Sequence, residues 1–240
     1  MNQGGATMIK NPRRSTVLLV ILLTVDVILI SFHFLHRLTY RGIIQSAIFS
    51  NTIFSMSEEG KLPDVYFYLK QFAIILLLLY VARKKERVYA VWAGIFSYLL
   101  LDDVFWIHER LGFIFQDFAP QIGHVDPAEI AQSGYLVLLS IFLFGISLLI
   151  IWRTKGEPRL VSIYLTGFLA AAAFFGVFVD MIQGVVMDMF GISGIVKIVE
   201  DGGEMMIFSF IVWYVYRLAF ETIPIIHYKR FLLRPRQSGA

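Results

Sequence analysis

The chain has 240 residues, of which 58% are hydrophobic and 16% are charged, and its mean hydropathy is +0.70. This apolar surface exceeds what one soluble core can bury, so the composition predicts a protein whose solvent is lipid. The absence of cysteine excludes disulfides, thiolate catalysis and thiolate metal ligands. The net charge of +3 does not indicate nucleic-acid binding, because the basic residues lie in short segments between apolar runs.

Six apolar segments are long enough to cross a bilayer, whose hydrocarbon core requires roughly 20 helical residues. In chain order they cover about residues 16–35, 65–82, 88–107, 134–152, 160–181 and 195–218. The first follows a basic stretch as in a signal peptide, but it lacks a small-x-small cleavage site, so we expect a retained helix. The pattern predicts an all-α, single-domain bundle of six transmembrane helices, followed by a basic tail at 219–240.

Basic residues between these segments predict the orientation of the bundle. Fifteen Lys and Arg residues lie in the N-terminus, in 83–87, in 153–159 and in the tail from Arg217, whereas the alternate loops hold four. Since positively charged loops stay in the cytoplasm, we expect both termini to be cytoplasmic. The two longer loops, about 36–64 and 108–133, then face outward and are expected to cap the bundle.

Acidic residues concentrate on the predicted outer side. Fourteen of the eighteen lie there, and Asp26 lies near the middle of the first span. The acids inside the predicted helices near their outer ends are Asp102, Asp103, Asp180, Glu200, Asp201 and Glu204. At about 1.5 Å of rise per residue, the acids of the third and sixth spans and Lys70 of the second reach a similar depth. A charge at that depth is costly, so we expect these groups to face the protein interior and to be paired.

Helical spacing predicts which of these residues share a face. Tyr98, Asp102 and Glu109 are expected to form one stripe, and Lys197 lies one turn before Glu200 and Glu204. Gly176, Asp180 and Gly184 recur every four residues, which is typical of a face that another helix approaches closely. So many carboxylates cannot all stay ionised unaided: some are protonated, or Lys70 and Lys197 compensate them, or a cation is bound.

The functional interpretation of this set is a divalent-cation site. Carboxylates are the usual ligands of Mg²⁺, Ca²⁺ and Mn²⁺, and they also bind Zn²⁺. The expected metal ligands are Asp102, Asp180, Glu200, Asp201 and Glu204. The expected accessory residues are Asp26, Lys70, Asp103, His108, Glu109 and Lys197. The alternative is that the acids are solvated at the interface or paired with lysines.

Three residues need separate interpretation. His108-Glu109 is only half of a His-Glu-x-x-His motif, and on a continuous helix His108 lies about 120° from Asp102, so we expect an interfacial residue rather than a ligand. Lys70 is expected to be a counter-ion for the acids. Asp26 has two open interpretations, a proton-relay acid and a partner in one interhelical hydrogen bond.

Two short motifs carry a resemblance to known sequences. Asp102-Asp103 is followed by His108-Glu109, and Glu200-Asp201 is followed by Glu204. This pattern resembles uncharacterised bacterial multi-pass membrane proteins in which an acidic pair and a His-Glu end one helix and a Glu-rich patch opens the last. The resemblance covers about half of the chain and implies a protein of the bacterial inner membrane, without indicating a substrate.

Three classes of function remain open. The leading hypothesis is a cation-binding membrane protein; as an enzyme, it would catalyse metal-assisted hydrolysis or transfer on a lipid-linked substrate. The second is an ion- or proton-coupled transporter in which Asp26 extends the path through the membrane. The third is a structural or assembly subunit whose acids pair with basic residues of another chain.

Overall fold

The structure is a computed structural model that describes residues 14–56, 60–121, 126–179 and 193–221. The described residues form seven α-helices and contain no strand. The helices are α1 (Arg14–Tyr40), α2 (Leu62–Lys84), α3 (Val88–Phe105), α4 (Ile107–Phe115), α5 (Pro127–Arg153), α6 (Gly156–Ala173) and α8 (Ser193–Phe220). A π-helical segment, η3 (Phe174–Val179), continues α6. Six helices, all but α4, are long and apolar enough to cross a membrane, which confirms the predicted fold class.

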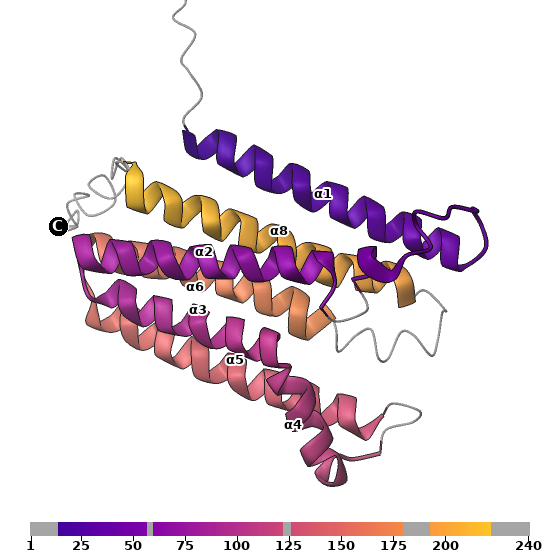
Figure 1. Ribbon diagram of the computed structural model, residues 1–240. Coiled ribbons are helices and arrows are strands. Elements are labelled where there is room, and N and C mark those ends of the chain that lie inside the picture. The colour runs from indigo at the N-terminus through magenta and orange to yellow at the C-terminus, as the bar shows by residue number, and fades with distance from the viewer. Residues whose placement is uncertain (1–13, 57–59, 122–125, 180–192, 222–240) are drawn as a thin grey trace, which may run out of the picture.

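The spans run side by side in one bundle, with α1 on one side of α8 and α2 on another (Figure 1). α8 packs against α1, α2 and α6, while α2 pairs with α3, and α5 contacts both α4 and α6. The described helices α3 and α6 end, and α2, α5 and α8 begin, at the same end of the bundle. α8 therefore begins at the end of the bundle where α3 ends.

The bundle buries an apolar core and exposes apolar side chains on its outside. Trp92, Phe96, Leu165, Ile211 and Val215 are almost fully buried and belong to one cluster. The indole N–H of Trp92 donates to the Ser162 hydroxyl at 3.0 Å, which satisfies a polar group in this core. Every span also exposes large apolar side chains, as expected of helices whose outer faces contact lipid.

α3 ends two residues before the expected limit of the third span, at a turn that the apolar pattern did not predict. α3 ends at Phe105, and Trp106 adopts a left-handed backbone conformation with φ 50° and ψ 45° before α4 begins. A residue in this conformation cannot continue a right-handed helix, so Asp102 and Glu109 do not share one helical stripe. The chain instead turns at Trp106, and α4 leaves the end of α3 as a short separate helix (Figure 1).

Candidate functional site

A cavity of about 380 Å³ lies among α2, α3, α4, α5, α6 and α8, at the end of the bundle where α3 ends. We call this cavity the acidic chamber. Its ionisable lining residues are Asp64, Asp102, Asp103, His108, Glu109, Lys197, Glu200, Asp201 and Glu204. The chamber thus unites acids of α3 and α8 that are about 100 residues apart in sequence. Seven carboxylates face one lysine and one histidine among these lining residues.

The turn at Trp106 brings His108 back onto α3. His108 Nδ1 lies 2.9 Å from Asp102 Oδ2, and Asp102 is only 3% exposed. The expectation that His108 lies away from Asp102 is therefore wrong, because it assumed that one straight helix continues through Trp106. Ligand atoms of Asp102, Asp103 and His108 all lie within 4.8 Å of one another, so these three residues form a group that could hold a metal ion.

Neighbouring polar side chains fix the two aspartates. The Tyr135 hydroxyl of α5 donates to Asp102 Oδ1 at 3.3 Å and also forms a hydrogen bond with Tyr98. The amide of Gln71 on α2 donates to Asp103 Oδ2. Since partners on other helices hold both carboxylates, their positions are set by the packing of the bundle rather than by α3 alone.

The acids around His108 favour its positively charged form. Burial alone would lower the pKa of His108, but the hydrogen bond to Asp102 and the negative charges of Asp102, Asp103 and Glu109 raise it above its usual value. The position beside these carboxylates therefore stabilises a positive charge. A proton on the imidazole or a bound metal ion would each provide one.

The acids of α8 are arranged around Lys197. Lys197 Nζ lies 3.0 Å from Glu200 Oε1 and 3.2 Å from Asp201 Oδ1. These ion pairs agree with the alternative in which lysine compensates part of the acidic set.

Glu204 lies deeper along α8, and its carboxylate occupies the space that a Cβ at position 176 would fill. Gly176 therefore gives room to Glu204, in the π-helical segment that continues α6. The expected ligand Asp180, with Gly184, lies outside the described residues.

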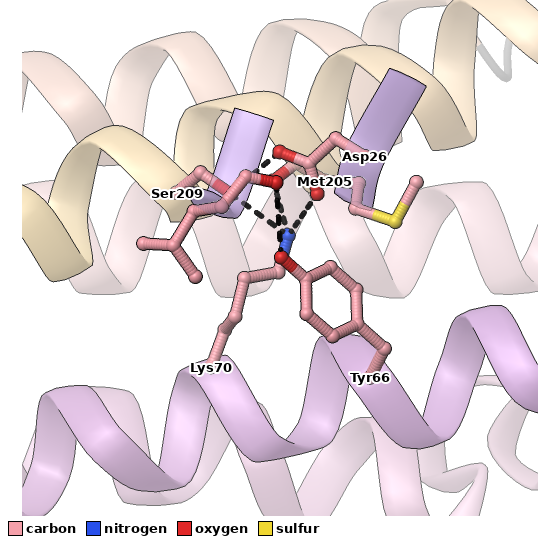
Figure 2. Close-up of polar contacts among 6 residues, drawn as sticks. Asp26, Tyr66, Lys70, Met205 and Ser209 are labelled. Atoms are coloured by element: carbon pink, nitrogen blue, oxygen red, sulfur yellow. Dashed lines mark hydrogen bonds and ion pairs between the residues drawn. The ribbon is translucent and has the colours of Figure 1, made fainter. Parts of the chain in front are cut away.

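Lys70 does not compensate the acidic chamber. Its Nζ forms an ion pair with Asp26 Oδ1 at 2.9 Å and donates to Met205 O at 2.6 Å and to Ser209 Oγ at 3.2 Å. Ser209 Oγ donates in turn to Asp26 Oδ2 at 2.6 Å. Figure 2 shows these contacts beside the ring of Tyr66. The centroid of that ring lies 4.5 Å from Lys70 Nζ. The expected role of Lys70 is thus wrong, because its position along α2 fixes its depth but not the neighbour toward which it points.

Asp26 makes more contacts than the single interhelical hydrogen bond of one open interpretation, while the proton-relay interpretation stays a prediction. Asp26 is fully buried, Lys70 is 3% exposed, and their network joins α1, α2 and α8. The Tyr66 hydroxyl adds a further link by donating to the Leu22 carbonyl of α1 at 3.1 Å. Each of the three hydrogens of the ammonium has an acceptor, which is what a charge inside a membrane bundle requires.

A family model described as a domain of unknown function, DUF8692, matches residues 16–218. The chain belongs to the DUF8692 family. The matched range covers the six spans, except for two residues at the start of α1 and two at the end of α8, and contains every residue named for the acidic chamber. Membership agrees with the expectation of an uncharacterised family. No curated protein and no solved structure matches the chain.

Three polar residues of this DUF8692 chain were missed by sequence reasoning. Asp64 lines the chamber and also accepts the backbone N–H of Lys61 at 3.2 Å, which caps the start of α2. Its place just after Pro63 is a helix-start signal that was available in the sequence. Gln71 and Tyr135 were not predicted, because neutral side chains within apolar helices carry no charge that marks them, although neutral donors commonly position carboxylates.

Proposed function

We propose that this DUF8692 protein binds a divalent cation in its acidic chamber, next to Asp102, Asp103 and His108. The observation that carries the proposal is the excess of carboxylates over basic groups around one cavity. The negative charges of carboxylates around one cavity repel one another, and a bound cation would offset part of that repulsion. The excess persists when Lys197 and His108 are counted, because seven carboxylates line the cavity with only these two basic side chains among its described lining residues.

The donors at the α3–α4 turn suit a metal that accepts both oxygen and imidazole. If His108 Nδ1 donates its proton to Asp102, the neutral ring keeps a lone pair on Nε2 for a metal ion. An aspartate behind a ligating histidine is a common arrangement, since it fixes the tautomer and the ring orientation. Asp103 would supply an oxygen ligand.

The ligand types favour particular metals. Imidazole with carboxylates favours Zn²⁺ or Mn²⁺, while a site made of the carboxylates alone favours Mg²⁺ or Ca²⁺. Glu200, Asp201, Glu204 and Asp180 remain candidate ligands in this proposal.

The deeper lining of the chamber supports a lipid-linked substrate. Along α8 the acids are followed by Met205 and Phe208, and along α5 Gln132 is followed by Leu139 and Leu143, all of which line the cavity. One cavity therefore offers charged groups near the bundle end and apolar side chains farther in, which fits a ligand with a polar head and an apolar tail. We propose metal-dependent hydrolysis or group transfer on such a substrate, in which the metal would lower the pKa of a bound water.

The basic loops support an outward-facing chamber. If segments 83–87 and 153–159 are cytoplasmic, the opposite end of the bundle, which carries the acids, faces outward. With the resemblance to bacterial multi-pass proteins, this orientation supports a chamber on the periplasmic side of an inner membrane as part of the proposal.

Metal binding to the purified protein tests the proposal. We expect wild-type protein to bind Mn²⁺ or Zn²⁺ at one site, and His108→Ala and Asp103→Asn to abolish this binding. Asp102→Asn should weaken it by about 10- to 100-fold, because it removes the group that orients His108. Isothermal titration calorimetry and elemental analysis after dialysis measure both effects.

Asp117→Asn is the matched control for these variants. Asp117 is an exposed acid beyond α4 that does not line the chamber, so its replacement removes one negative charge and leaves the site intact. Equal metal affinity in wild type, Asp103→Asn and Asp117→Asn would show that the α3–α4 turn does not hold the cation. Wild-type protein without any divalent-metal affinity would refute the proposed function itself.

Ion- or proton-coupled transport is a second candidate, favoured by one contact. Met205 lines the acidic chamber, and its backbone carbonyl accepts a hydrogen bond from Lys70 of the buried network. The ammonium of Lys70 therefore lies next to the lining of the acidic chamber, farther into the membrane. Cation uptake into proteoliposomes that is lost in Asp26→Asn, with unchanged metal affinity in detergent, would favour transport over hydrolysis.

A further inference from the structure

α4 and the 3-10 turn that follows it, η2 (Gln116–Phe118), carry a large apolar surface on one side. Phe113 is 69% exposed, Ile114 is 65% exposed and Phe118 is 84% exposed. Arg110 and Asp117 are also exposed and recur on this face at the i, i+3, i+4, i+7 and i+8 spacing. Two charges thus accompany a patch of three large apolar side chains.

The opposite side of α4 faces protein. Gly112 is buried against α5, where a Cβ would lie 2.7 Å from the Ala128 carbonyl oxygen. His108 and Glu109 line the acidic chamber. α4 therefore has one face fixed to the bundle and one face that no described residue covers.

We propose that the exposed face of α4 and η2 lies in the membrane–water interface at the outward-facing end of the bundle, with Phe113, Ile114 and Phe118 inserted among lipid acyl chains. α4 has nine residues, far fewer than the roughly 20 that cross a bilayer, so it cannot be a span. The left-handed Trp106 turns it away from the direction of α3. A short amphipathic helix at the end of a span is typical of an interfacial segment.

The apolar surface of α3 identifies lipid as the occupant. Leu101, Val104 and Phe105 are exposed in the last turns of α3, which is a membrane span. The exposed side chains of α4 follow after a single turn, so they continue a surface that already contacts lipid. Arg110 and Asp117 would then meet headgroups and water, as polar groups of interfacial helices do. This placement does not depend on cation binding in the acidic chamber.

Site-directed spin labelling tests the proposal in the full chain, which has no native cysteine to interfere. Nitroxide labels at F113C and F118C would be compared in vesicles of phosphatidylcholine and phosphatidylglycerol. Power-saturation electron paramagnetic resonance measures collision with oxygen, which partitions into lipid, and with a water-soluble nickel chelate. We expect both labels to favour oxygen, at a depth of about 5–10 Å below the headgroups.

V27C and E86C provide the reference positions. Val27 is exposed in the middle of the α1 span, and Glu86 is exposed in the loop between α2 and α3. The α4 labels should give values between those of these two sites. Nickel accessibility equal to that of E86C would overturn the proposal, since the face would then be in water. Shielding from both reagents with dipolar broadening would overturn it too, because a second copy of the chain would then cover the face.

Discussion

Lys70→Met is expected to lower the free energy of unfolding by about 3–5 kcal/mol, the typical cost of removing one partner of a buried ion pair. The variant leaves the Asp26 carboxylate in the centre of the bundle with Ser209 as its remaining hydrogen-bond donor in the described network. Asp26 is fully buried, so solvent cannot replace the lost ammonium. Titration with sodium dodecyl sulfate in mixed micelles, followed by circular dichroism, measures the free energy of unfolding.

The double variant Asp26→Leu with Lys70→Met should recover most of this loss. Replacing both charges by apolar side chains removes the uncompensated carboxylate, and such replacements are often neutral or stabilising. If the double variant is as unstable as Lys70→Met, the cost comes from lost packing around the network rather than from the buried charge.

Lys85→Met provides a matched control for Lys70→Met. Lys85 Nζ lies 2.6 Å from Glu157 Oε1, but these side chains are 37% and 35% exposed. Water screens such a pair, so its loss should cost less than about 1 kcal/mol. An equally small effect of Lys70→Met would contradict the role assigned to the buried network in holding α1 against α2 and α8.

The six spans could be predicted because length and hydropathy are enough to identify them. A segment that spans lipid must be both long and apolar, and each of the six expected segments corresponds to one helix of the structure. The helices α1, α2 and α5 extend several residues beyond the expected limits. Their backbone remains helical after the sequence becomes polar at the interface, which an apolar threshold cannot detect.

The acidic chamber could be predicted only in part. Depth along a helix follows from residue counting, and this argument correctly brought acids of α3 and α8 to the same end of the bundle. The partner of each side chain depends on helix rotation and on which helices are neighbours. Sequence periodicity gives neither for a helix that is apolar on all sides. For this reason Lys70 was assigned to the acids although it contacts Asp26.

The position of His108 depended on one backbone conformation. Residues 100–112 contain no glycine or proline before Gly112, so nothing in the sequence marks a helix end at Trp106. A tryptophan with positive φ is rare, and such strained residues occur preferentially at functional sites. The turn at Trp106 made the predicted position of His108 wrong, and the same turn brings His108 to Asp102.

The close contact between α4 and α5 predicts a large effect of Gly112→Ala. The new Cβ would lie 2.7 Å from the Ala128 carbonyl oxygen and 3.0 Å from the Gln132 Cβ, so α4 must move away from α5. Overpacking of this kind typically costs about 1–3 kcal/mol. Because α4 carries His108, we also expect weaker Mn²⁺ or Zn²⁺ binding, measured by calorimetry beside the free energy of unfolding.

Gly134→Ala on α5 is the control for this variant, because its Cβ would meet no described atom within 4 Å. Alanine is a better helix former than glycine, so Gly134→Ala should stabilise the protein by about 0.5–1 kcal/mol and leave metal affinity unchanged. The two Gly→Ala substitutions therefore have opposite expected signs. Stabilisation by both would mean that α4 does not pack closely on α5. Destabilisation by Gly112→Ala with unchanged metal affinity would separate the position of α4 from the cation site.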